Sequence, residues 1–299
     1  MSTPRNSARV VSLLSSATEI LHALDGIPLL AGRSHECDFP PEVLHLPCCT
    51  KPLIDIHADS RAIDQQVKSS ARNALSIYEV FDAVLEELQP THILTQVQCE
   101  VCAVSLKDVE RSIATRLKSA PQIVPLNPNC LADIWDDFRR VGSALGLDAE
   151  SAVTRLRGKM EALRRPQSGI RVAVVEWIEP LMAAGNWTPE LVSMAGGVNL
   201  FGRTGEHSPW MTWEELVASK PDVTIIAPCG FDLVRTLGEM HWLTERAEFG
   251  QLGEVFLADG NSWFNRPGPR VVEALEILLE ILHGHGSRLE GLAWVRFRG

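Results

Sequence analysis

The stretch ADIWDDFRRVGSALGLDAESAVTRLRGKMEALRR, residues 132–165, decides the fold that we expect. Apolar residues recur in it at three- and four-residue intervals, which is the spacing of an amphipathic helix. Gly146 interrupts this pattern, so we expect the helix to kink or break there. Strand-like sequence lies on both sides of the stretch, so the sequence predicts two lobes joined by one long helix.

The residues before this stretch alternate between short apolar runs and helical patterns. A helix that Gly26 ends is expected after the first strand, and a second helix is expected at 80–88. A chain that alternates strand and helix forms a parallel sheet with helices on its faces. The expected strands of this first lobe are 9–14, 28–32, 92–95 and 123–126.

A second series of strands and helices follows the long helix. Thr212 precedes a helical pattern and Glu215 lies three residues later, which predicts a capping box. The expected elements are strands at 171–176, 223–227 and 255–258 and helices at 188–195, 212–218 and 269–283. We therefore expect an α/β fold of two Rossmann-like lobes with parallel sheets, joined by a long interdomain helix, with a ligand cleft between the lobes. The expected parts are an N-terminal lobe (1–130), a bridging helix (131–168), a C-terminal lobe (169–284) and a loose tail (285–299).

Composition narrows the classes of partner. The chain of 299 residues is 45% hydrophobic and 22% charged, which is ordinary for a globular protein and excludes a disordered or coiled-coil chain. Its 28 basic and 38 acidic residues give a net charge of −10, which disfavours nucleic acid and anionic lipid as partners. No run approaches about 18 apolar residues, so no membrane span is expected. The first residues lack the apolar segment of a secretory signal, which predicts a cytoplasmic protein, and the odd cysteine count of seven argues against a disulfide scaffold.

Four segments, in order and spacing, carry a resemblance to one family. They are RVVSLLSSATE (9–19), DFPP (38–41), the stretch 208–226 and SWFNRPGPR (262–270). Together they resemble the vitamin B12- and iron-siderophore-binding proteins of ABC importers, over roughly residues 9–283. The resemblance implies non-catalytic binding of cobalamin or a related corrinoid or metal chelate between the lobes, with an ABC importer as partner. If the resemblance decides the compartment, the protein is periplasmic.

The chain departs from that family in its first lobe. An extra stretch lies at about 60–79. His35, Glu36 and Cys37 stand where the B12 binders usually carry small and aromatic residues. Cys99 and Cys102 follow the strand at 92–95, in a position that faces the cleft in the family. These departures bear on which ligand is bound.

The candidate ligand-binding residues lie near the carboxyl ends of strands, where open α/β sheets bind ligands. The resemblance implies that Trp263 and Phe264 cover a flat macrocycle while Arg266 donates to amide carbonyls, and His207 is a candidate donor to a corrinoid cobalt. The alternative is that Trp263 only packs against the last helix and that His207 is a solvated loop histidine. The candidates are His35, Glu36, Cys37, Trp187, His207, Trp210, Trp263, Phe264, Asn265 and Arg266.

The candidate metal ligands are Cys99, Cys102, His35 and Cys37, a set of soft donors that suits zinc, cobalt or an iron–sulfur cluster. A shared ion would require the Cys37 and Cys99 sulfurs to lie within about 6 Å of each other. The CxxC pair could instead be a redox pair, or the thiols could simply pack. The alternative function is therefore a cytosolic metal-binding or redox protein.

Catalysis has no support in the motifs. The sequence contains no G-x-S-x-G, P-loop, G-x-G-x-x-G or H-E-x-x-H pattern. Asp133, Asp136 and Asp137 have helical spacing and are expected on a solvated helix face. We therefore expect a binding protein and not an enzyme.

Overall fold

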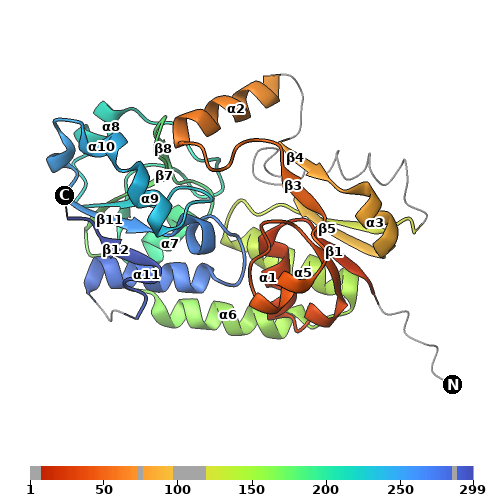
Figure 1. The fold of residues 1–299 in the computed structure, drawn as a ribbon. Helices are drawn as coiled ribbons and strands as arrows, with labels where there is room; N and C mark the ends of the chain where they lie inside the picture. The colour runs from red at the N-terminus through yellow and green to blue at the C-terminus, as the bar shows by residue number, and fades with distance from the viewer. Residues whose placement is uncertain (1–7, 73–76, 97–118, 285–287, 299) are drawn as a thin grey trace. The chain divides into compact units, whose positions relative to one another are not determined.

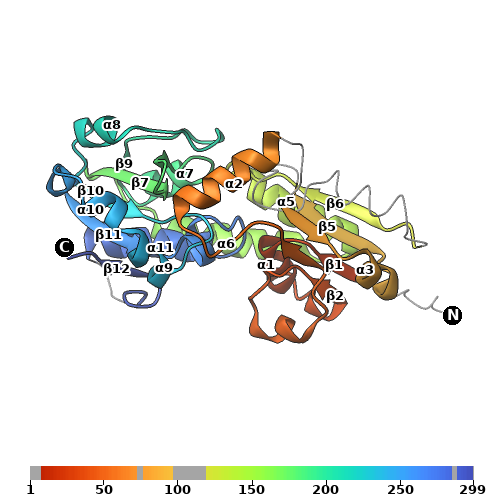
Figure 2. The same ribbon diagram turned by 45° about the horizontal axis from the view of Figure 1, so that its top comes forward.

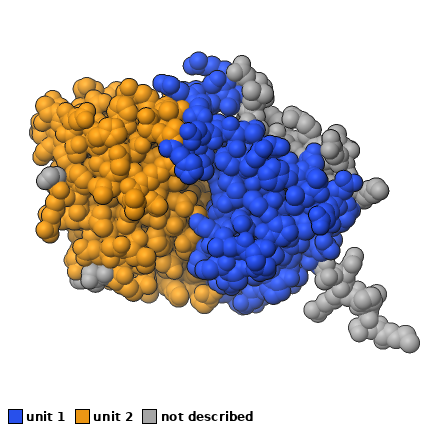
Figure 3. Space-filling view, viewed as in Figure 1, with its two compact units in different colours: residues 1–57, 65–127, 133–153 blue, residues 58–64, 128–132, 154–299 orange. Residues whose placement is uncertain are grey.

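The computed structural model describes residues 8–72, 77–96, 119–284 and 288–298. The chain divides into two compact units, which are coloured separately in Figure 3. Unit 1 comprises residues 1–57, 65–127 and 133–153, and unit 2 comprises 58–64, 128–132 and 154–299. The expected α/β class with two lobes is confirmed.

Unit 1 is built on a four-stranded parallel sheet with the order β2-β1-β5-β6 (Figure 2). β1 is central, because the chain adds β2 on one side of it and β5 on the other. Its core includes Val11, Leu13 and Ile93, all at most 1% exposed. The elements of this sheet layer are β1 (Val10–Ser12), α1 (Ser15–Ala23), β2 (Leu30–Arg33), α3 (Asp82–Leu88), β5 (His92–Gln96) and β6 (Gln122–Leu126), with short 3₁₀ turns at Ile27–Leu29 and Pro41–His45.

A small two-stranded antiparallel sheet extends unit 1 beyond the carboxyl end of β2. It pairs β3 (Thr50–Pro52) with β4 (Tyr78–Val80). The backbone N–H of Cys49 donates to the Arg33 carbonyl at 2.7 Å, which holds the start of β3 next to the end of β2. The extra stretch of sequence lies between these two strands and contains α2 (Ser60–Arg72).

The long helical pattern forms two helices, α5 (Leu131–Leu145) and α6 (Ala149–Leu163), both visible in Figure 1. The break is at Gly146, whose φ of +68° lies in the left-handed region that glycine tolerates best. Asp137 is only 1% exposed, so the expectation of a solvated face is wrong for this residue. Its carboxylate accepts from the backbone N–H of Asn127, which lies just after β6.

Unit 2 contains a six-stranded sheet with the order β12-β11-β10-β7-β8, and β9 also pairs with β7. β7, β10 and β11 are parallel to one another, as expected. The expected capping box is confirmed, because Thr212 Oγ1 accepts from the Glu215 N–H and the Glu215 carboxylate accepts from the Thr212 N–H. The strands are β7 (Arg171–Trp177), β8 (Met182–Ala183), β9 (Val198–Asn199), β10 (Val223–Ile226), β11 (Glu254–Ala258) and β12 (Trp294–Arg296). The helices are α7 (Thr188–Met194), α8 (Trp213–Ala218), α9 (Leu233–Glu239), α10 (His241–Thr244) and α11 (Val271–His283), with a 3₁₀ turn at Phe249–Gln251 and a π-helical turn at Gly260–Phe264.

The end of the chain is not the loose tail that the sequence suggested. β12 pairs antiparallel with β11 and forms an edge of the sheet. Trp294 is 6% exposed, and its indole N–H donates to Glu280 on α11 at 2.7 Å. A large buried aromatic side chain thus anchors a segment that is too short to be recognised from its own pattern.

No helix within the described ranges is both long and apolar enough to cross a membrane.

Candidate functional site

The loop after β11 contains most of the candidate residues of unit 2. Asp259 ends the strand region, and its carboxylate accepts from the Ser262 N–H at 2.6 Å. A Cβ on Gly260 would lie 2.6 Å from the Ala227 carbonyl oxygen and closer still to that of Pro228, so only glycine fits there. The chain therefore makes a tight π-helical turn, Gly260–Phe264, directly after the strand.

Three of the candidate side chains brace this turn from inside the protein. Arg266 is 3% exposed, and its guanidinium donates to the backbone carbonyl of Asn261 at 3.0 Å and to the Asn261 side chain at 3.3 Å. Trp187 is 6% exposed and donates its indole N–H to the Phe264 carbonyl at 3.1 Å. Phe264 itself is 1% exposed. In this conformation these residues fix the shape of the loop and do not present a surface.

Trp263 is the candidate that this turn presents. Its side chain is only partly buried, and the guanidinium carbon of Arg270 lies 5.6 Å from the centre of its ring. Asn265, next along the loop, donates its amide to the Ala227 carbonyl at the end of β10, at 2.9 Å. This hydrogen bond joins the loop to the neighbouring strand, so the backbone that carries Trp263 is held in place.

A second loop of unit 2 carries His207 and Trp210. His207 is exposed, and its Nδ1 lies 2.9 Å from the Ser208 carbonyl oxygen. Because a carbonyl can only accept, the neutral imidazole carries its proton on Nδ1 and has its lone pair on Nε2. Ser208 is buried and bonds to the Glu176 carboxylate on β7 at 2.9 and 3.0 Å. Trp210 is 55% exposed, which is unusual for so large an apolar side chain.

In unit 1, the candidates His35 and Glu36 lie in the turn after β2. The His35 Nδ1 lies 2.7 Å from Thr50 Oγ1, and its Nε2 lies 3.9 Å from the Glu36 carboxylate. Burial, together with the nearby Arg33 guanidinium, lowers the pKa of His35 to about 4. The imidazole is therefore neutral at ordinary pH, and its ring is held by the contact with Thr50 of β3.

The predicted thiol site is not supported by the position of Cys37. Its side chain is 0% exposed, and its sulfur accepts from the Thr18 hydroxyl at 3.0 Å. Cys99 and Cys102 lie outside the described residues, as does the test that joins the Cys37 and Cys99 sulfurs. Within the described ranges, no group of three or more His, Cys, Asp or Glu side chains could hold a metal ion.

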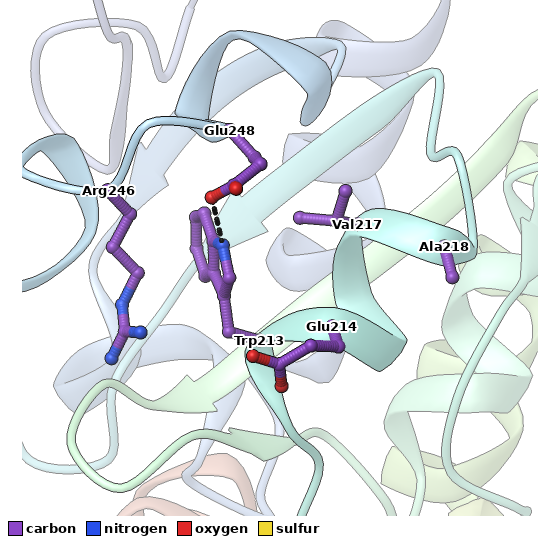
Figure 4. Close-up of a pocket in the computed structure, with 6 residues that line it drawn as sticks. All are labelled: Trp213, Glu214, Val217, Ala218, Arg246 and Glu248. Carbon is purple, nitrogen blue, oxygen red and sulfur yellow. Dashed lines mark hydrogen bonds between the residues drawn. The ribbon is translucent and has the colours of Figure 1, made fainter.

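An open concavity of about 460 Å³ lies elsewhere on unit 2, beside α8. Figure 4 shows the ring of Trp213 between Arg246 and the helix, with its indole N–H directed at Glu248. That hydrogen bond is 3.1 Å long and lowers the pKa of the Glu248 carboxyl. The guanidinium carbon of Arg246 lies 5.2 Å from the Trp213 ring centre. The Trp213 indole thus already contacts Glu248 and Arg246, and none of the candidate residues from the sequence lines this concavity.

Sequence reasoning missed two residues beside His35, namely Thr50 and Tyr78. The Tyr78 hydroxyl donates to the Glu36 carboxylate at 3.1 Å, and its ring centre lies 5.3 Å from that of His35. The available signal was that Tyr78 is the one tyrosine in 299 residues. Nothing local in the sequence placed Tyr78 next to the turn after β2, because the pairing of β4 with β3 brings it to that turn.

Sequence comparison finds relatives among the vitamin B12-binding proteins. The protein of that name from Vibrio cholerae serotype O1 is 24% identical over 283 residues, covering 91% of this chain and 88% of the relative. The vitamin B12-binding protein of Photorhabdus laumondii is 31% identical over 98 residues, covering 33% of each chain. No family model matches the chain.

Solved structures with the same fold include binding proteins for different ligands. A periplasmic heme binding protein from Pseudomonas aeruginosa has a TM-score of 0.67 at 18% identity, covering 97% of this chain and 98% of that one. The periplasmic vitamin B12 binding protein of Vibrio cholerae has a TM-score of 0.60 at 20% identity, covering 91% and 95%. The resemblance to the B12- and iron-siderophore-type periplasmic binding proteins is confirmed.

Proposed function

We propose that this chain, a relative of the B12- and iron-siderophore-type periplasmic binding proteins, binds a metal-containing macrocycle without transforming it. Cobalamin is the first choice of ligand, because the sequence relatives are B12-binding proteins by name. Haem is the other choice, because heme-binding proteins share the fold. The observation that carries the proposal is Trp263, presented on a turn that buried side chains hold in place.

The chemistry of unit 2 supports a flat ligand with a metal centre. An indole ring covers a flat conjugated or corrin ring with a large apolar area. His207 offers an imidazole with a lone pair on Nε2, which is the donor that cobalt and iron accept from proteins. Trp210, three residues further on, supplies a second indole, and this one is 55% exposed. We assign Trp187, Phe264 and Arg266 to positioning the loop.

Unit 1 adds polar groups at the carboxyl edge of its own sheet. His35 and Glu36 remain proposed ligand contacts, because their side chains are 18% and 36% exposed in the turn after β2. Cys37 is left out of the ligand contacts, because it is fully buried. The thiol-based alternative function has no observation in its favour among the described residues.

The proposed partner and compartment follow the relatives. We propose that the protein delivers its ligand to an ABC importer from the periplasm, and the predicted cytoplasmic location finds no support among the relatives. A binding protein of this kind returns its ligand chemically unchanged, which separates it from an enzyme.

A ligand panel tests the proposal. Purified protein is titrated with cyanocobalamin, haem and a ferric hydroxamate siderophore, and binding is followed by quenching of tryptophan fluorescence. We expect one ligand to saturate at one per chain and to be recovered intact by mass spectrometry. The proposal is wrong if none of the three binds saturably, or if the bound ligand is recovered as a different compound.

A further inference from the structure

Three unlike metal-binding side chains converge in unit 1, and of these only His35 belongs to the predicted set of metal ligands. His35 and Glu36 come from the turn after β2, and Tyr78 comes from the start of β4. The Glu36 Oε1 atom lies 3.1 Å from the Tyr78 hydroxyl and 3.9 Å from His35 Nε2. Donors that share one ion through bonds of about 2.1 Å lie roughly 3–4 Å apart, so this spacing fits a common ion.

The His35 ring is oriented as a metal ligand would be. Thr50 Oγ1 donates its one proton to Ser34 Oγ, at 3.2 Å. It therefore accepts from His35 Nδ1–H at 2.7 Å, and also from the His35 backbone N–H at 3.0 Å. Nε2, the atom that faces Glu36, consequently keeps its lone pair. Metal-binding histidines are commonly fixed in this way by a hydrogen bond from their other ring nitrogen.

The three groups are reachable from solvent and already packed together. The His35 side chain is 18% exposed and that of Glu36 36% exposed, while Tyr78 is partly buried. The His35 and Tyr78 ring centres are 5.3 Å apart. The guanidinium of the neighbouring Arg33 donates to the carbonyls of Ser34 and Leu44. A cation would thus need small side-chain rotations and no change of the backbone.

We propose that the imidazole of His35, the carboxylate of Glu36 and the phenolate of Tyr78 together bind one iron(III) ion on unit 1. Two anionic oxygens and one neutral nitrogen form a hard donor set, unlike the thiolates that zinc and copper(I) favour. Tyrosine oxygen is a known ligand of iron in proteins. When the ion binds, the Tyr78 hydroxyl releases its proton to solvent, and the oxygen bonds to iron and no longer donates a hydrogen bond to Glu36. This site stands on unit 1 alone and does not depend on the proposed function.

The single tyrosine of the sequence makes the test unambiguous. Iron(III) is added to the ligand-free protein as ferric nitrilotriacetate, and the visible spectrum is recorded. A phenolate bound to iron(III) gives a charge-transfer band in the visible, and here it can arise from Tyr78 alone. We expect the band in the native protein, its loss in Tyr78→Phe, and at least tenfold weaker iron binding in Glu36→Gln and His35→Gln.

His241→Gln is the matched control, because it removes an exposed histidine of unit 2 that has no part in either proposal, and it should leave the band unchanged. Iron binding without the band, or a band that survives in Tyr78→Phe, would overturn the site. Titration of Tyr78→Phe with the macrocycle panel keeps the two proposals apart. If the panel fails with the native protein while the iron band appears, only the proposed function is wrong.

Discussion

At the scale of single residues, Asp137 shows how burial changes the effect of pH. The carboxyl group is 1% exposed, and burial raises its pKa to about 7 in spite of its pairing with Arg140. Between its ordinary pKa of 3.8 and about 7, the folded chain holds a proton that the unfolded chain releases. The contribution of Asp137 to the free energy of unfolding therefore falls as the pH rises through this window.

The prediction is that Asp137→Asn removes this part of the pH dependence. An asparagine oxygen can still accept from the Asn127 N–H, so the fold should survive. Urea unfolding at pH 5 and pH 7.5 checks it: the native protein should lose more stability between these values than the variant does. Asp136→Asn is the matched control, because that side chain is 61% exposed. Equal pH dependence in the native protein and Asp137→Asn would contradict the assignment.

Residues differ in how far their roles could be read from the sequence. The importance of the segment from Ser262 to Arg270 could be predicted, because its pattern resembles that of the B12 binders. The burial of Arg266 could not, since it depends on a turn that brings Asn261 around the guanidinium. Tyr78 was missed for the same reason, because its partner Glu36 is distant in sequence.

At the scale of elements, the turn after β11 depends on Gly260. Any Cβ at this position would press on the carbonyl oxygens of Ala227 and Pro228 at the end of β10. Gly260→Ala should therefore cost about 1–3 kcal/mol of unfolding free energy, as for other overpacked sites, and should displace Trp263. Urea unfolding monitored by circular dichroism measures the loss. Gly250→Ala is the control, because nothing lies within 4 Å of its added Cβ. A variant at 260 as stable as the one at 250 would show that the turn relaxes easily.

Elements set by local signals were predictable, and those set by distant contacts were not. The capping box of Thr212 and Glu215 and the break at Gly146 both follow from neighbouring residues, and both are present. The strands β3, β4 and β12 lack such signals, because each of these strands has only three residues. Pairing with a distant strand stabilises them, and the sequence alone does not reveal it.

At the scale of the whole molecule, the two units carry different chemistry at the carboxyl ends of their parallel strands. Unit 1 presents His35 and Glu36, which are polar, and unit 2 presents Trp263 with His207 and Trp210 on a second loop. The family resemblance pointed to Trp263, whereas His35 and Glu36 depart from the family pattern. The residues that brace the loop after β11 emerged only from the structure.

The most direct test of the account is the affinity of Trp263→Ala for the tightest ligand of the panel, measured by isothermal titration calorimetry. The native protein should bind one ligand per chain. Loss of an aromatic contact, about 0.5–1.5 kcal/mol beyond lost area, should weaken the variant at least about threefold. Trp263→Phe should recover most of the affinity, and all three proteins should have the same unfolding midpoint. An affinity in Trp263→Ala equal to that of the native protein would contradict the central claim that Trp263 contacts the ligand.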